Sequence, residues 1–129
     1  LAHEYRSHAD RLSERLRKRL AGSAATAFGD YRSMLRQAAD ARRDVGALFG
    51  DVDVLLYPSA EGEAEPGIEY SGSPRFGALW TLLHLPSIAF PIAHGPGGLP
   101  VGAQLIGSYL EDDVVLAAAE FAVRVADYG

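Results

Sequence analysis

The sequence predicts an α/β fold in which a pair of long helices precedes a small sheet and a last helix covers that sheet. Three observations support this order. Apolar residues recur at helical spacing through the first fifty residues, three short apolar runs bounded by proline or glycine follow, and the chain closes with another run of helical spacing. We expect a helical pair over residues 1–50 and a single, incomplete α/β segment over residues 51–129.

The first fifty residues carry two helical patterns. Between His3 and Leu20, apolar residues fall three or four positions apart and form one stripe, made of Tyr5, Ala9, Leu12, Leu16 and Leu20. Gly22 is the expected stop of this helix. A second pattern runs from Tyr31 to Phe49. The short linker between the two patterns predicts an antiparallel helical hairpin.

Beyond Asp51 the pattern changes to short strands. The apolar run Val52–Tyr57 is too short for a helix and predicts a buried strand that Pro58 ends. Ser87–Phe90 and Val101–Ile106 predict two more strands, joined by a sharp turn. Because strands as apolar as these need cover on both faces, we expect the segment to belong to a larger sheet.

A long loop and two helices complete the predicted elements. Residues Ser59–Pro74 are acidic and rich in Gly, Pro and Ser, which indicates a loop of unusual length. Phe76–Leu83 predicts a short helix. A last helix, capped by Asp112 or Asp113, is expected to bury one face. The residues of that face are Val114, Val115, Ala118, Phe121, Ala122 and Val125.

Composition and charge exclude several classes of function. The 129 residues include no cysteine, so disulfides, thiolate metal sites and cysteine nucleophiles are excluded. The first 43 residues carry a net charge of +5 and the rest −10. This asymmetry keeps a nucleic-acid-binding helix pair as an alternative, but no aromatic residues interleave with the arginines, and we expect no nucleic-acid partner. No apolar run approaches the ~20 residues of a membrane span, and nothing resembles a signal peptide, so a cytoplasmic chain is expected.

Common catalytic and cofactor motifs are missing. No Gly-x-Ser-x-Gly elbow occurs. His3 and His8 stand five residues apart, which predicts different faces of one helix, and His84 and His94 have no carboxylate at metal-ligand spacing. The cluster Gly95–Gly98 lacks the last glycine of a dinucleotide fingerprint and predicts a tight turn. We therefore expect no metal and no cofactor.

The loop carries alternating glutamates that are expected to be solvated. Catalysis by paired carboxylates needs rigid elements that hold two groups at a fixed separation, and a loop does not supply them. The four residues are Glu61, Glu63, Glu65 and Glu69.

Three strings resemble the amidase signature family. Asp51–Pro58 is similar to the family's Asp-x-Leu-x-x-Pro strand, and Leu79–Pro91 to a helix that runs into a proline-flanked strand. Gly97–Gly107 is similar to its Gly-Leu-Pro-x-Gly-x-Gln strand. Order and spacing agree over Asp51–Ala126, and the first fifty residues resemble the helical pair that precedes this region. The resemblance implies the C-terminal part of a mixed sheet flanked by helices and preceded by a helical hairpin.

The resemblance also implies an activity, whose catalytic residues this chain lacks. Members hydrolyse a linear carboxamide to acid and amine with a nucleophilic serine, a second serine and a lysine base, without a cofactor. Here no Gly-Gly-Ser-Ser-Gly string occurs, and the one lysine, Lys18, stands among arginines. The chain alone is predicted to be inactive. The expected partners are the amide substrate in the full-length enzyme, the N-terminal catalytic portion of that enzyme, and a second copy of the chain in a homo-oligomer. A non-catalytic binding or assembly domain is the alternative.

Pocket-wall and scaffold roles do carry over from the resemblance. The pocket-wall candidates, in the part of the family that varies with substrate, are Tyr57, Tyr70, Ser71 and Trp80, although Trp80 can equally be core. The resemblance implies that three prolines end or shape strands and that two glycines allow close backbone approach; these residues are Pro58, Pro86 and Pro91, and Gly98 and Gly102. His84 stands where many members have glycine, which implies either an altered helix end or an imidazole near the pocket.

Overall fold

The computed structural model describes residues 2–68 and 70–126, and the chain divides into two compact units, residues 1–37 and 38–129. The division lies inside helix α3 (Phe28–Asp44). Two residues explain its position. Ala38 is the buried residue of α3, and Val45, directly after the helix, packs in the core of the second unit.

The first unit begins with short helices in place of the single helix predicted over His3–Leu20. They are α1 (Ala2–Ser7), the 3-10 helix η1 (Ala9–Arg11) and α2 (Glu14–Ala24). The break follows from Ser13, whose hydroxyl accepts a hydrogen bond from the backbone N–H of Leu16 at 3.3 Å and so starts a new helix. The predicted stop at Gly22 is wrong, because α2 continues through it to Ala24.

The predicted apolar stripe is retained despite this break. All five of its members are half-buried, whereas α1 and α2 contain no buried residue. Residues 25–27 join α2 to α3, and the two helices make only marginal contact in the described part of the chain. The packed antiparallel hairpin is therefore not found there.

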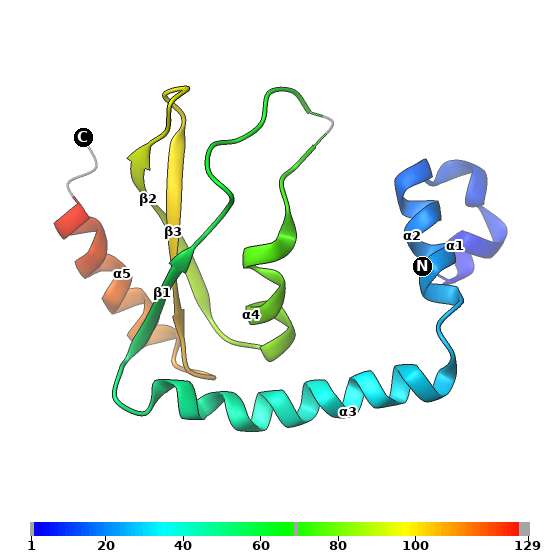
Figure 1. Ribbon diagram of the computed structural model, residues 1–129, viewed down its shortest axis with the longest axis horizontal. Coiled ribbons are helices and arrows are strands. Elements are labelled where there is room, and N and C mark those ends of the chain that lie inside the picture. The colour runs from blue at the N-terminus through cyan, green and yellow to red at the C-terminus, as the bar shows by residue number, and fades with distance from the viewer. Residues whose placement is uncertain (1, 69, 127–129) are drawn as a thin grey trace. The chain divides into compact units, whose positions relative to one another are not determined.

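The second unit is built on a three-stranded antiparallel sheet in the order β1-β3-β2 (Figure 1). Its strands are β1 (Val54–Pro58), β2 (Ser87–His94) and β3 (Pro100–Gly107). Residues 103–107 of the central strand β3 are all buried, but β1 is half-buried at its start and exposed at its end. The prediction of a buried first strand is wrong, because only the start of β1 is covered. Leu55 and Val54 pack against the cores on the two faces, whereas Leu56 is 68% exposed.

Strand β2 is longer than predicted. It continues past Phe90 to His94, so Pro91 lies inside the strand instead of ending it. The register with β3 shifts between Pro91 and Ala93, which marks a bulge. An edge strand accommodates proline because its missing N–H can face away from the neighbouring strand.

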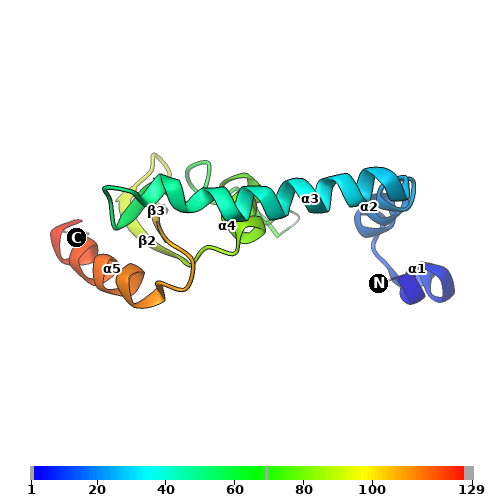
Figure 2. The ribbon, with the colours of Figure 1, turned by 90° about the horizontal axis from the view of Figure 1, so that it is seen from below.

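Helices cover both faces of the sheet. Leu105 and Ile106 are consecutive residues of β3, and their side chains enter two different core clusters. Ile106 packs with Trp80 and Leu83 of α4 (Ala78–Leu83), whereas Leu105 packs with Val115 of α5 (Asp112–Ala126). Accordingly, α4 and α5 lie on opposite sides of the sheet (Figure 1, Figure 2).

The buried face of α5 differs from the predicted one. Val115 and Ala119 are buried, with Ala118 and Ala122 partly buried beside them, whereas Phe121 and Val125 are 69% and 65% exposed. At about 100° per residue, these two lie farther round the helix than the residues that face the sheet. Asp112 and Asp113 occupy the first turn, where carboxylates complement the helix dipole. None of the described helices is both long and apolar enough to cross a membrane.

Candidate functional site

Two of the four predicted pocket-wall residues meet in an aromatic cluster. Tyr57, near the end of β1, stands edge-on to Trp80 in α4 and to Phe76 in the 3-10 helix η3 (Pro74–Phe76), with ring centroids 5.6 and 5.7 Å apart. Such pairs stabilise a fold by about 0.5–1.5 kcal/mol beyond burial. Tyr57 is 43% exposed and Trp80 is 7% exposed, so Tyr57 is the one of the two that a ligand could reach.

Trp80 belongs to the core cluster on the α4 side of the sheet. Its indole N–H is buried and has no hydrogen-bond acceptor among the described residues. An unsatisfied buried donor of this kind is unusual in folded proteins. The residue is thus a core residue with an unmet polar group.

Tyr70 and Ser71 are placed differently. Both lie on the loop that leads to η3, and both are exposed. The structure therefore brings Tyr57 and Trp80 into ring contact, and it places Tyr70 and Ser71 on the surface of the loop ahead of them.

A buried polar residue that sequence reasoning did not select connects this cluster to the central strand. Gln104 of β3 is 6% exposed, and its Nε2 donates hydrogen bonds to the backbone carbonyls of Pro58 at 2.9 Å and Phe76 at 2.8 Å. The side chain fastens the end of β1 and the end of η3 to the sheet. The available signal was one polar residue inside the apolar run Val101–Ile106.

Two grooves lie on the sheet near this cluster, and we call them the sheet grooves. One has a volume of about 410 Å³ and is lined by residues of all three strands, including Leu56, Ile92 and Val101, together with Ala60 of the loop. The other has a volume of about 450 Å³ and is lined by residues of β2 and β3 together with Ser59. Their walls are mostly apolar, which suits an alkyl or aryl group better than an ion.

The predicted scaffold residues take several roles. Pro58 is the last residue of β1, and the carbonyl of Pro86 accepts a hydrogen bond from the N–H of Gly107 at 3.0 Å. A Cβ at Gly102 would overlap Oγ of Ser59, so the backbone approach there is close. Gly98 has open space around it and a φ of 79°, so its glycine serves the left-handed backbone and not a close approach.

His84 occupies a left-handed position at the end of α4. Its φ is 61° and its ψ is 32°, and the N–H of the next residue, Leu85, donates to the carbonyl of Trp80 at 3.0 Å. This is the conformation in which helices commonly place glycine. The imidazole is exposed, so His84 forms an altered helix end.

The glycine-rich turn and the acidic loop contact each other, which the sequence did not predict. Gly95–Gly98 forms the turn between β2 and β3, as expected. Glu63 of the loop is bound to the backbone of this turn, so its predicted full solvation is wrong. Glu61 pairs with Arg75 at 3.4 Å on the exposed surface. Glu69 lies outside the described residues.

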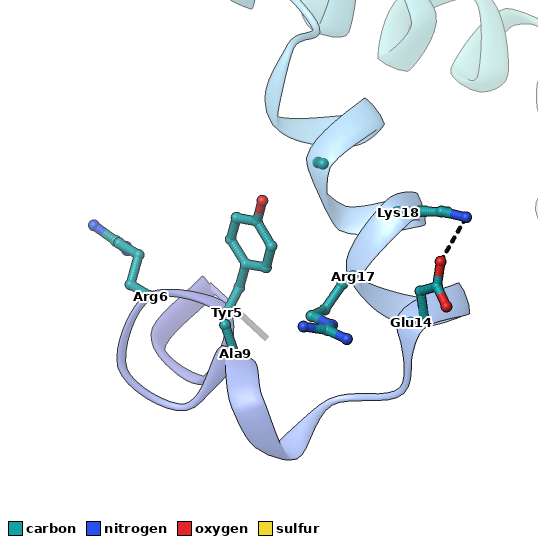
Figure 3. A pocket seen from close by; sticks show the side chains of 7 residues that line it. Tyr5, Arg6, Ala9, Glu14, Arg17 and Lys18 are labelled. Atoms are coloured by element: carbon teal, nitrogen blue, oxygen red, sulfur yellow. Dashed lines mark ion pairs between the residues drawn. The ribbon is translucent and has the colours of Figure 1, made fainter.

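The first unit holds a shallow groove of about 660 Å³ between α1, η1 and α2 (Figure 3). Tyr5 and Arg17 lie in its walls, and Lys18 forms an ion pair with Glu14 at 2.7 Å, in which both side chains are exposed. Lys18 is therefore a solvated, paired ammonium group and not the desolvated lysine that can act as a base.

The prediction that His3 and His8 lie on different faces of one helix is wrong. The rings of His3 and His8 lie 5.8 Å apart, because α1 ends between them and brings the two residues together. Within residues 2–68 and 70–126, no group of three or more His, Cys, Asp or Glu side chains could hold a metal ion.

Comparison with known proteins identifies relatives over nearly the whole chain. The family described as Amidase matches residues 3–116. A Glutamyl-tRNA(Gln) amidotransferase subunit from Synechococcus sp. (strain WH7803) is 36% identical over 126 residues, which cover 89% of this chain and 26% of the relative. The corresponding subunit from Neisseria meningitidis (strain DSM 15465 / Z2491) is 32% identical over 118 residues, covering 83% of this chain and 24% of the relative.

Solved structures agree with these sequence relationships. A crystal structure of an amidase has a TM-score of 0.83 and 29% identity, over 95% of this chain and 31% of the other. A structure from a vestigial protein complex, described as revealing the evolutionary origins of an s-triazine catabolic enzyme, has a TM-score of 0.79 and 23% identity over 95% of this chain and 30% of the other, and supports the fold alone. The chain spans about a quarter to a third of the length of the relatives it matches.

Proposed function

Because the chain belongs to the amidase family, we propose that it forms the C-terminal portion of a hydrolase that cleaves a linear carboxamide to an acid and an amine. The observation that carries the proposal is the likeness to an amidase crystal structure over 95% of this chain but only 31% of the other. A piece of that size can supply scaffold and pocket walls while the reacting groups come from the rest of the protein.

The proposed reaction assigns no catalytic residue to this chain. In the full-length enzyme, a serine hydroxyl attacks the amide carbonyl while a second serine relays its proton to a lysine. The proton is passed on to the departing amine, and water then hydrolyses the acyl-serine, which releases the acid and restores the serine hydroxyl. Backbone N–H groups of the upstream serine-rich loop stabilise the oxyanion. Lys18 does not fit the role of the base, because it is exposed and paired with Glu14.

The residues of this chain are proposed to bind and orient the substrate. Tyr57 is the exposed member of the aromatic cluster and Trp80 contacts it edge-on, while Tyr70 and Ser71 are exposed on the preceding loop and are proposed to contact the substrate from there. The apolar walls of the sheet grooves favour a substrate that carries an alkyl or aryl group on its acyl or amine part.

Two measurements of amine release test the proposed function. The 129-residue chain, incubated with a panel of linear aliphatic and aryl carboxamides, is expected to release no amine above the protein-free rate. The full-length protein is expected to turn over at least one of them and to lose that activity after treatment with a sulfonyl fluoride. Turnover by the chain alone that the same reagent blocks would overturn the assignment of catalysis to the upstream portion.

The alternative is a non-catalytic binding or assembly domain. The open outer edges of β1 and β2 within the described residues and exposed apolar side chains such as Leu56 and Phe121 fit a partner-binding surface as well as they fit a part of a larger sheet. Sedimentation and thermal melting separate the two proposals. An independent domain is expected to show a sharp, cooperative transition, as a monomer or as a homo-oligomer, whereas a detached part of a larger sheet is expected to aggregate or to melt gradually.

A further inference from the structure

The turn between β2 and β3 holds a single carboxylate from elsewhere in the chain. Oε2 of Glu63 accepts the backbone N–H of Gly97 at 2.9 Å, and Oε1 accepts the N–H of Leu99 at 2.8 Å. The turn also closes on itself, because the N–H of Gly95 donates to the carbonyl of Leu99 at 2.9 Å. Two alternate N–H groups thus point at one anion, and each makes a charge-assisted hydrogen bond.

The glycines of this turn are explained by the space that the carboxylate fills. A Cβ at Gly95 would overlap the side chain of Glu63, and a Cβ at Gly97 would lie 2.8 Å from its Oε2. Neither glycine has a positive φ, so the backbone itself does not demand glycine at these two positions. The Gly95–Gly98 cluster does not match a dinucleotide-binding motif, and it forms the binding site for the Glu63 side chain instead.

This contact joins two walls of the sheet grooves. Ser59 and Ala60, which line the grooves, stand a few residues before Glu63 on the loop. Pro100 and Val101, which line them from the other side, directly follow the turn that Glu63 holds. The loop wall is already joined to β3 by the N–H of Ser59, which donates to the carbonyl of Gly102 at 3.0 Å, and the Glu63 contact adds a second connection nearer the turn.

We propose that Glu63 is a positioning residue that binds the glycine-rich turn and thereby holds the sheet grooves in the shape that receives the substrate. The proposal rests on the proposed function because it assigns a substrate to the grooves. The contact between Glu63 and the turn does not depend on that assignment. Glu65, two residues further on the same loop and exposed, provides a matched acidic control.

A double-mutant cycle on the full-length protein tests the contact. Gly95→Ala is expected to lower the urea midpoint of unfolding in the parent chain, because the added methyl displaces Glu63. In the Glu63→Ala background the same change is expected to have no cost, since its clashing partner is gone. Equal effects of Gly95→Ala in the Glu63→Ala and Glu65→Ala backgrounds would overturn the proposal.

Amide hydrogen exchange tests the same contact at individual backbone N–H groups. Glu63→Gln is expected to raise exchange at Gly97 and Leu99 by about tenfold, and to change exchange at Gly95 less, because the partner of that N–H is Leu99 and not Glu63. Glu65→Gln is expected to leave all three rates unchanged. Unchanged exchange at both Gly97 and Leu99 in Glu63→Gln would contradict the proposal.

Kinetics of the full-length enzyme test the positioning role. Glu63→Gln is expected to raise KM by about three- to tenfold with kcat within about twofold, because the groove binds substrate and does not react with it. A fall in kcat with KM unchanged, or the same change in Glu65→Gln, would overturn the positioning role. If the full-length protein shows no amidase activity but Glu63→Gln still raises exchange at Gly97 and Leu99, the proposed function is wrong and the binding of Glu63 to the turn is confirmed.

Discussion

The side-chain nitrogen of Gln104 lies 2.8 Å from the backbone carbonyl of Phe76, and the same nitrogen donates to Pro58. One buried amide on the central strand therefore holds both the end of β1 and the segment before α4. The aromatic cluster of Tyr57, Phe76 and Trp80 depends on this bond, because it fixes the backbone from which two of the three rings project.

Replacing this amide with a hydrocarbon of similar size is expected to destabilise the fold. Gln104→Leu leaves the two partly buried carbonyls without their side-chain donor, and the free energy of unfolding is expected to fall by about 1–3 kcal/mol. Urea denaturation followed by circular dichroism measures this. Gln37→Leu is the control, because Gln37 is exposed on α3, and its effect is expected to stay within about 0.5 kcal/mol. Equal losses for both variants would show that the Gln104 bonds contribute nothing.

His84→Gly is expected to stabilise the chain. The left-handed backbone at the end of α4 strains a residue with a Cβ, and glycine removes that strain, which raises the free energy of unfolding by about 1 kcal/mol. His84→Ala removes the imidazole but keeps the Cβ, so it is expected to bring no such gain. A loss of stability in His84→Gly, measured by thermal melting, would mean that the imidazole makes a stabilising contact in solution.

Trp80 is expected to tolerate phenylalanine far better than alanine. Trp80→Ala opens a cavity in the core and is expected to cost about 3–5 kcal/mol. Trp80→Phe keeps most of the ring volume and removes an N–H that has no acceptor among the described residues, so less than about half of that loss is expected. Guanidinium unfolding followed by circular dichroism compares the two. Equal losses would indicate that the indole N–H finds a partner in solution.

Adding a single methyl group between α5 and β3 is expected to lower the free energy of unfolding. A Cβ at Gly107 would overlap Val115, which is 2% exposed and cannot move aside, so Gly107→Ala is expected to cost about 1–3 kcal/mol. In a Val115→Ala background the same substitution is expected to cost less, because the space has been vacated. Gly46→Ala is the control, since its Cβ would meet open space. Additive losses at Gly107 and Val115 would refute the steric explanation.

Local signals predicted the elements well where the controlling residues were neighbours in the sequence. The order of helices and strands follows the predicted order, and the apolar stripe from Tyr5 to Leu20 remains half-buried although Ser13 divides its helix. The predicted end of β2 was wrong at Pro91, because proline ends a strand only where its N–H is needed by a neighbour.

The candidate site was less accessible to prediction. Tyr57 and Trp80 were selected and do meet, but Gln104, which supports them, was not, because its two acceptors lie 46 and 28 residues away. The expectation that Glu63 is solvated failed for the same reason, since Gly97 and Leu99 stand 34 and 36 residues farther along the chain.

The sequence by itself determined the succession of elements, the family and the absence of cysteine chemistry, because periodicity, motif strings and composition are properties of neighbouring residues. The tertiary structure alone decided that β3 is the central strand, that Glu63 occupies the glycine-rich turn and that His84 ends α4 in a left-handed conformation. These features depend on which distant groups fill a space or satisfy a hydrogen bond, and no local pattern specifies that choice.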